Sequence, residues 1–291
     1  MRRSYIELLL CVFLAAGSSP FGARERVIVR NGTVLSDRGT LLRGVTMELD
    51  EPGAPSSNAA LDPSHWKAAH DLKLNVVRFD VKLSAAHMSL KDQLPSIDKA
   101  VNLAAQNDMY IALMNSTRPG NHNTKELQDF WSVVAQRYKD RTHVLYEMVN
   151  EPVAWEPRDY KSQDIFDLKS VYHIMRSKAP QTHIVLWDFA NLGVGDGHET
   201  VGKISKMSGV DYSNTSVGFH YYTTSKKQIT TIKSTYPVFM TETSPGDKTD
   251  DIENLKNCER VGVSWISLEG KQDNFDRMQK EILPALHSSS S

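Results

Sequence analysis

Two glutamic acids stand at the ends of apolar segments that are far apart in the chain. The run HVLYEMVNEP (143–152) ends on Asn150, Glu151 and a proline, and the run YPVFMTE (236–242) ends on Glu242. Proline cannot donate a ladder hydrogen bond, so a strand is expected to stop there. Two carboxyl groups that meet across a cleft can serve as an acid and a nucleophile when their environments separate their pKa values. The alternative is a polar turn whose carboxylate caps a helix or joins an ion pair.

Both runs belong to a series in which strand-like and helix-like segments alternate from Leu41 onward. The expected strands are apolar runs bounded by turn residues, at 41–48, 74–80, 109–115, 143–151, 183–188, 216–222, 236–242 and 261–269. Each is followed by a segment with helical spacing, of which 197–209 is the least regular. Eight strands that each precede a helix predict an α/β protein, a single (β/α)8 TIM barrel over 24–286. Two short strands around turns within 26–44 predict a β-hairpin that closes the barrel bottom.

In a barrel of this kind the active site lies at the C-terminal ends of the strands. The expected strands end on Glu48, Asp80, Asn115, Glu151, Asp188, Tyr222, Glu242 and Glu269. Arg78 and His220 lie two positions before a strand end and should face the same way as the end residue, while Trp265 lies within the last strand. Such a rim suits acid/base chemistry on a neutral polar substrate, and it would also suit a hard metal ion. Position alone does not choose which two carboxylates act.

A set of short motifs narrows this choice. YEMVNEP and VFMTET, together with LNVVRFD, GFHYYT and the lead-in NGTVLSDRGTLLRGV, occur in the order of the expected strands. The set resembles glycoside hydrolase family 5, the cellulase family within the retaining (β/α)8 glycosidase clan, over nearly the whole mature chain. The resemblance implies that Glu151 is the catalytic acid/base and Glu242 the nucleophile. Retaining hydrolysis needs two such carboxyl groups about 5–5.5 Å apart.

The resemblance also implies roles in substrate binding. Asn150 would hold the sugar 2-hydroxyl, and Arg78 and Tyr222 would flank the nucleophile. His220 and Trp265 would line the sugar site at the cleavage point, where the indole offers a flat apolar face to a sugar ring.

Two further residues are predicted to contact the substrate, on weaker support from the motifs. Trp155, in the loop after the fourth strand, would extend the stacking platform. Asn115 stands where the family usually has a histidine, and His122 is a candidate substitute seven residues later. Glu147 should point into the barrel in a buried, hydrogen-bonded structural role. Structural or outer-subsite roles are favoured for three further strand-end carboxylates, Asp188, Glu48 and Glu269.

The N-terminus predicts secretion. Arg2 and Arg3 precede the apolar run 8–16 and a stretch of small residues, which is the pattern of a secretory signal over 1–23. Its apolar core is shorter than the roughly 20 residues that cross a bilayer. The 291 residues carry a net charge of −1, which gives no electrostatic footprint for nucleic acid or an anionic membrane. The last five residues, 287–291, form a serine-rich tail.

These features predict a secreted, extracellular, retaining endo-β-1,4-glycanase that acts by double displacement, with endoglucanase (cellulase) activity on β-1,4-glucan favoured. An endo-β-1,4-mannanase is the alternative within the same chemistry, and a catalytically silent carbohydrate-binding protein on the same fold is a third hypothesis. The expected partner is a polysaccharide or oligosaccharide, either β-glucan or mannan. No cofactor, metal, nucleic acid or membrane partner is expected after signal cleavage, and the protein should be a monomer.

Overall fold

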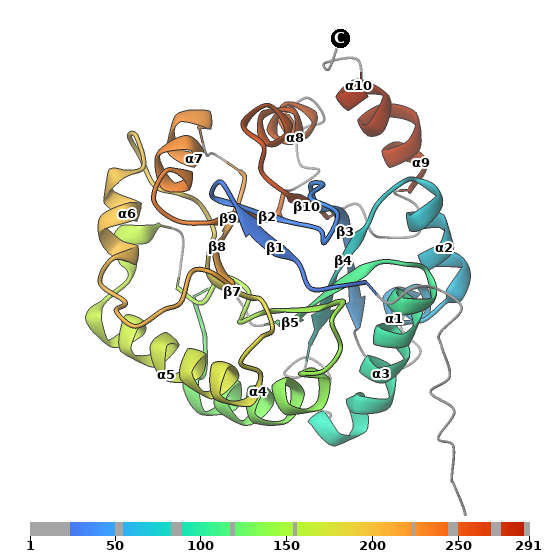
Figure 1. The fold of residues 1–291 in the computed structure, drawn as a ribbon, viewed down its shortest axis with the longest axis horizontal. Helices are drawn as coiled ribbons and strands as arrows, with labels where there is room; N and C mark the ends of the chain where they lie inside the picture. Colours follow the sequence, from blue (N-terminus) through green and yellow to red (C-terminus); the bar gives the residue numbers. More distant parts are fainter. Residues whose placement is uncertain are drawn as a thin grey trace, which may run out of the picture.

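The computed structural model describes residues 24–49, 55–82, 89–116, 120–153, 156–222, 225–243, 250–268 and 275–287. Viewed end-on, the strands form a central ring and the helices surround it (Figure 1). The predicted secretory signal, Trp155, Glu269 and residues 288–291 of the serine-rich tail lie outside the described residues.

The ring is a closed barrel of parallel strands. They are β3 (Arg43–Leu49), β4 (Val76–Val81), β5 (Tyr110–Asn115), β6 (Val144–Glu147), β7 (Ile184–Phe189), β8 (Thr215–His220), β9 (Val238–Glu242) and β10 (Trp265–Ser267). Neighbours pair in chain order, and β10 closes the ring by pairing with both β9 and β3. The predicted TIM barrel is therefore confirmed. β6 is shorter than expected, because its regular pairing ends four residues before Glu151.

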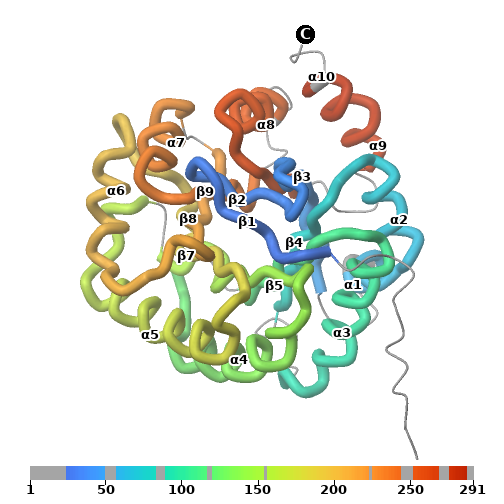
Figure 2. The backbone as a smooth tube through the Cα atoms, viewed as in Figure 1, coloured from blue at the N-terminus to red at the C-terminus, as the bar shows by residue number. Residues whose placement is uncertain are grey.

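The helices form the outer layer. They are α1 (Pro55–Ala60), α2 (Pro63–Asp71), α3 (Leu90–Gln106), α4 (Thr124–Tyr138), α5 (Ser162–Lys178), α6 (His198–Ile204), α7 (Lys226–Lys233), α8 (Asp250–Val261), α9 (Phe275–Arg277) and α10 (Leu283–His287). A 3-10 turn spans Pro157–Asp159, and a π-helical turn, Met278–Ile282, joins α9 to α10. The helical end of the chain returns beside α2 (Figure 2), where the rings of His65 and Phe275 lie 4.5 Å apart. The last helical segment thus packs against α2 and closes the ring of helices around the barrel.

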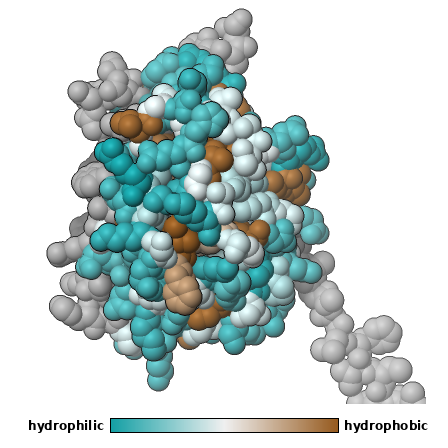
Figure 3. Space-filling view, turned by 90° about the vertical axis from the view of Figure 1, so that its left-hand side faces the viewer, coloured by the Kyte–Doolittle hydropathy of each residue, from teal (hydrophilic) through white to brown (hydrophobic). Residues whose placement is uncertain are grey.

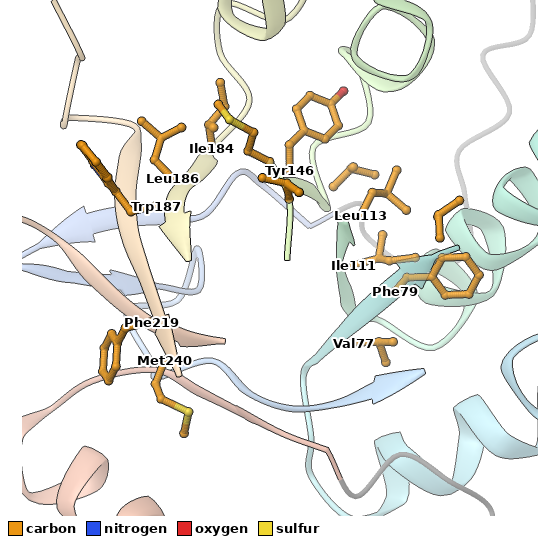
Figure 4. Packing of buried hydrophobic residues seen from close by; sticks show 14 of the residues in the cluster. Val77, Phe79, Ile111, Leu113, Tyr146, Ile184, Leu186, Trp187, Phe219 and Met240 are labelled. Atoms are coloured by element: carbon orange, nitrogen blue, oxygen red, sulfur yellow. The ribbon is translucent and has the colours of Figure 1, made fainter. Parts of the chain in front are cut away.

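Apolar side chains fill two separate spaces. The larger lies between the barrel and the helices, where alternate strand residues point outward (Figure 4), among them Phe79, Leu113 and Met240. The smaller fills the bottom of the barrel interior with Val34, Leu42, Val76, Tyr110, Ala112, Leu145, Val185, Phe239 and Ile266, a group called the barrel floor below. Together the two layers hold the strands rigidly, which is the requirement for a precise site at their C-terminal ends.

The N-terminal hairpin crosses the bottom of the barrel (Figure 1), as predicted. β1 (Ile28–Arg30) and β2 (Thr33–Leu35) are antiparallel, and β2 also pairs with β9. The turn residues Asn31 and Gly32 both have positive φ, which is the conformation that a two-residue hairpin turn requires. Only glycine fits the second position, because a Cβ there would lie 2.3 Å from the carbonyl oxygen of Lys233.

On one side of the molecule the surface is mostly hydrophilic, and its apolar areas are small and separate (Figure 3). The large apolar side chains exposed among the described residues are Val133, Phe166, Val194 and Tyr222. None of the described helices combines the length and the apolar character that crossing a membrane requires.

Candidate active site

Glu151 stands on an irregular turn that follows β6 and is braced from several sides. The indole Nε1 of Trp131 in α4 donates to the carbonyl of Met148 at 2.8 Å, and the N–H of Asn150 donates to the carbonyl of Asn115 at 3.2 Å. Glu151 itself has φ +38°, a left-handed conformation that costs a non-glycine residue on the order of 1–3 kcal/mol. Its side chain is nevertheless buried at the barrel mouth. The surrounding contacts therefore hold this carboxyl group in a conformation that the chain would not choose alone.

Two bulges shape the opposite wall. Pairing of β7 with β8 advances from Leu186 to Phe189 on one strand but only from Val217 to Phe219 on the other, so β7 holds one extra residue. β9 likewise holds an extra residue where it meets the end of β8, and this brings Glu242 level with His220. Bulges redirect side chains and occur often beside active sites.

Glu242 receives several donors at once. Arg78 donates from Nη1 to Oε2 at 2.7 Å, the hydroxyl of Tyr222 donates to Oε1, and His220 Nδ1 lies 3.6 Å from Oε1. Burial alone would raise the pKa of this carboxyl, but His220, Arg78 and the Tyr222 hydroxyl outweigh it and hold the pKa below its usual value. Glu242 is therefore kept as an anion, which is the state that a nucleophile needs.

Glu151 and Glu242 meet at His220. The Nδ1 atom of His220 lies 2.6 Å from Oε1 of Glu151, and one ligand atom from each of the three side chains lies within 4.8 Å of the others. The two carboxyl groups are thus close to the separation of about 5–5.5 Å that retaining glycosidases use, and nearer than the 6.5–9.5 Å of inverting ones.

A buried ion network lies beneath this pair. Arg78, which is 1% exposed, donates from Nε and Nη2 to Glu147 at 2.6–3.0 Å. Its Nη2 also donates to Asn150 Oδ1 at 2.9 Å and to Asp188 Oδ2 at 3.4 Å. One guanidinium therefore joins residues from β4, β6 and β7 and orients the Asn150 amide.

His220 and Asp188 form the second cation–anion pair of the network. Burial alone would lower the pKa of His220, but the carboxylates of Glu242 and Asp188 raise it well above its usual value. Burial alone would raise the pKa of Asp188, but His220 and Arg78 hold it below its usual value. A charged imidazolium thus lies between the carboxylates at the barrel mouth.

The same side chains include sets that could in principle bind a metal ion. Ligand atoms within 4.8 Å of one another come from Glu147, Asp188 and His220, and from Glu151, His220 and Glu242. Arg78, however, already contacts Glu147, Asp188 and Glu242 at 2.6–3.4 Å. A metal ion would have to displace this guanidinium, so the donor set fits an ion-pair network better than a metal site.

The family model Cellulase (glycosyl hydrolase family 5) matches residues 58–272, a span that contains this whole arrangement. The chain belongs to glycosyl hydrolase family 5. Curated relatives agree: Endoglucanase E-5 of Thermobifida fusca is 23% identical over 210 residues, 66% of this chain and 43% of that protein. Endoglucanase MaCel5A of Microbulbifer sp. is 24% identical over 186 residues, 57% of this chain and 35% of that protein. The chain thus spans less than half the length of these relatives.

Solved structures of family 5 share the barrel. The catalytic domain of Thermobifida fusca endoglucanase Cel5A matches with a TM-score of 0.67 at 19% identity, over 91% of this chain and 97% of that one. A mannotriose complex of Thermomonospora fusca β-mannanase matches with a TM-score of 0.61 at 16% identity, over 84% of this chain and 83% of that one. At these identities the likeness concerns the fold.

The structure brings most of the predicted site residues of this family 5 barrel together. They are Arg78, Asn150, Glu151, His220, Tyr222 and Glu242. The carboxyl group of Glu48 binds Lys82 at 3.0 Å, and that of Asp80 lies within the electrostatic influence of Arg78. Burial raises the pKa of Asp80 to about 7. His122 binds the carbonyl of Pro152 at 2.6 Å and so braces the loop that follows Glu151.

The prediction for Trp265 is corrected. Its side chain is fully buried, belongs to the layer between barrel and helices, and donates from Nε1 to Glu259 of α8 at 2.8 Å. The neighbouring Ile266 is the residue of β10 that faces the interior, as a member of the barrel floor. Alternation therefore turns the indole away from the barrel mouth, and Trp265 offers no surface for a sugar ring.

Asn115 is also placed differently from the prediction. It shares the outward face of β5 with Ile111 and Leu113, its side chain is fully buried, and neither amide atom has a hydrogen-bond partner among the described residues. The following Ser116 binds the carboxylate of Asp80 instead. Among the described residues, Asn115 contacts Asn150 through its backbone, and its side chain has no hydrogen bond to the candidate site.

Sequence reasoning missed the part that Asp188 plays, because strict alternation along β7 would turn Trp187 inward. The bulge reverses this: Trp187 stacks on Phe189 in the outer layer at a ring distance of 5.4 Å, while Asp188 faces Arg78 and His220. Trp187 and Asp188 have φ values of +76° and +39°. The sequence showed Asp188 as a carboxylate at a strand end, but it did not show that β7 holds an extra residue.

Proposed function

We propose that the protein is a retaining glycoside hydrolase that cleaves a β-1,4-linked glucan internally. One observation carries the proposal: Glu151 and Glu242 present oxygens within 4.8 Å of each other at the mouth of a family 5 barrel. That separation leaves room for the anomeric carbon of a sugar but too little for a catalytic water between the two groups.

The contacts support different roles for the two carboxyl groups. Glu242 faces the guanidinium of Arg78 and the hydroxyl of Tyr222, which favour its anion. In the first step its oxygen bonds to C1 of the sugar while Glu151 gives its proton to the departing glycosidic oxygen. The products are a covalent glycosyl-enzyme and a free chain end.

In the second step the roles of Glu151 and Glu242 are reversed. The ester at Glu242 carries no charge, so Glu151 as an anion takes a proton from a water molecule that attacks C1. The C1–Glu242 bond then breaks, and the sugar leaves with its original anomeric configuration. Asn150, whose Oδ1 accepts from Arg78, is proposed to bind the 2-hydroxyl, a contact that strengthens as the oxocarbenium ion forms.

Glucan is favoured as the substrate because both curated relatives described above are endoglucanases. A structural neighbour, the Thermobifida fusca Cel5A domain, was also solved with cellotetraose bound. Mannan is the second candidate, on the likeness to the β-mannanase with mannotriose. We also propose that the predicted signal in residues 1–23 directs secretion and that the protein is a monomer.

A substrate panel tests the function. Purified protein is incubated with carboxymethyl-cellulose, mixed-linkage β-glucan, galactomannan and xylan, and reducing ends are measured beside a Glu242→Gln control. We expect release from the glucans and none from the control. Faster release from galactomannan would identify a mannanase, and binding of cello-oligosaccharide without release would identify a silent binding protein. NMR of the first product must show the β-anomer, since inversion would contradict the double displacement.

A further inference from the structure

Asp188 is a buried carboxylate at the centre of the site to which the proposed reaction gives no part. Its Oδ2 atom accepts the backbone N–H of Glu151 at 3.3 Å and lies 3.2 Å from Nε2 of His220. The same oxygen lies 3.4 Å from Nη2 of Arg78. One oxygen therefore contacts the backbone of one proposed catalytic residue and the side chains that flank the other.

The molecule holds this carboxylate in place at an energetic cost. Trp187 and Asp188 both have left-handed φ values, which cost on the order of 1–3 kcal/mol each. Thr241 donates its hydroxyl to the other oxygen, Oδ1. Gly218 leaves the space that the bulge needs, because a Cβ there would lie 3.0 Å from Oδ1 and 3.2 Å from Cα of Asp188.

The contacts of Asp188 connect two features that the chemistry needs. Glu151 has its own left-handed φ of +38°, and the bond from its N–H to Asp188 stabilises that backbone. His220 presents Nδ1 to Glu151 only while its ring keeps one orientation, and Nε2, on the other side of the ring, is the atom that Asp188 contacts. An acceptor at Nε2 both orients the ring and favours its charged form.

We propose that Asp188 is a positioning residue, whose single carboxylate holds the turn of Glu151 and the imidazole of His220 in the arrangement that brings the two catalytic carboxyl groups together. The inference rests on the proposed glycosidase function. The competing interpretation is a structural ion pair with Arg78 that contributes only to stability.

The surroundings set the direction of the expected changes. Among the described residues, six charged or titratable groups act on Asp188. They are Arg78 on β4, Glu147 on β6, Glu151 after β6, Tyr160 before α5, His220 on β8 and Glu242 on β9. Removing the negative charge of Asp188 makes loss of a proton from His220 easier. The basic limb of kcat/KM should therefore move to lower pH.

The first test is Asp188→Asn, which can keep an oxygen toward Glu151 and His220 while its amide faces Thr241. We expect kcat to fall about 10- to 100-fold with KM nearly unchanged, the range that small misplacement of catalytic groups produces. Aryl glycosides with good leaving groups should lose less than polysaccharide, because they need less help from Glu151. Asp98→Asn is the matched control, since Asp98 pairs with Arg137 between α3 and α4, away from the barrel mouth.

A second variant guards against a folding failure of the first. Gly218→Ala keeps the carboxylate but places a methyl group 3.0 Å from its Oδ1 and 2.8 Å from Val185. We expect a smaller fall in kcat, with the pH limits of activity nearly those of the unmodified protein, because the charge remains. Unchanged kcat and pH profile in both folded variants, with only a lower Tm, would overturn the proposal.

A measurement without substrate separates this inference from the proposed function. Proton–nitrogen NMR of the His220 ring in the full chain reports two properties. They are the protonation state of the imidazole and the environment of its Nε2–H, which faces Asp188. We expect His220 to lose its proton at lower pH in Asp188→Asn than in the unmodified protein, and the Nε2–H signal to shift. An unchanged His220 titration would refute the role of Asp188 even in an active enzyme, whereas the expected shift in a protein inactive on every glycan would refute only the proposed function.

Discussion

The bottom and the mouth of the barrel are built from the same strands in opposite ways. In β4, β6 and β7 the lower inward residues are Val76, Leu145 and Val185, which pack in the barrel floor. The upper inward residues of the same strands are Arg78, Glu147 and Asp188, joined in one ion network. The bottom pairs regularly, while the mouth contains both bulges.

The difference separates the source of stability from the source of chemistry. Buried aliphatic side chains stabilise the bottom by roughly 1.5–3 kcal/mol each relative to exposure. Buried ion pairs contribute little net stability, because desolvation offsets most of their attraction. Three of the six non-glycine residues with positive φ in the described part of the chain lie at the mouth. The ion pairs and left-handed residues of the mouth keep their places because the barrel floor beneath them is rigid. Four substitutions test whether stability comes from the floor and chemistry from the mouth, from the largest expected effect on activity to the smallest.

Glu242→Ala should have the largest effect. Without the nucleophile no glycosyl-enzyme forms, so kcat on every substrate should fall about 10⁴-fold or more, as when other covalent catalysts are removed. Reducing-end release from glucan and cleavage of an aryl cellobioside measure the loss. Activity of a few per cent, with circular dichroism unchanged, would show that another carboxylate attacks C1.

Glu151→Ala should divide substrates by their leaving group. On polysaccharide we expect a loss of about 10²- to 10⁴-fold, the contribution of a general acid. With a dinitrophenyl cellobioside the first step needs no acid, so a rapid burst of phenolate should precede slow turnover. Stopped-flow absorbance resolves the two phases. Equal losses on both substrates would assign Glu151 a structural role instead.

Tyr222→Phe should shift the pH profile more than the maximal rate. The Tyr222 hydroxyl favours the anion of Glu242, so its removal raises the pKa of Glu242. Because Glu242 acts as the anion, the acidic limb of kcat/KM should move up by as much as about one pH unit, and activity should fall mainly below that limb. A shift to lower pH would show that the hydroxyl does not stabilise the anion.

Leu145→Ala should leave the chemistry unchanged. The substitution opens a cavity in the barrel floor, two residues before Glu147 on β6. It should lower the free energy of unfolding by about 2–5 kcal/mol. Urea unfolding measures that cost, and kcat with its pH profile should match the unmodified protein below the new midpoint. A changed pH profile in this variant would mean that floor and mouth are not independent.

The sequence by itself determined the barrel and the rim at which Glu151 and Glu242 meet. Apolar runs of strand length that alternate with helical segments have few compatible folds, and parallel strands gather their C-terminal ends at one rim. Glu151 and Glu242 could therefore be assigned to one opening although 91 positions separate them in the chain. The two-residue turn at Asn31 and Gly32 could also be predicted from the sequence, because its positive φ values restrict the residue types.

The tertiary structure decided which way the strand-end side chains face. Alternation is a rule for regular strands, and an extra residue in β7 and in β9 reverses it at Asp188 and brings Glu242 level with His220. Trp265 and Asn115 follow the regular rule and turn outward, against the prediction. A bulge forms only when neighbours such as Gly218 leave room and Thr241 supplies a partner. Those neighbours meet only after the barrel has closed, so no local pattern in the chain can specify them.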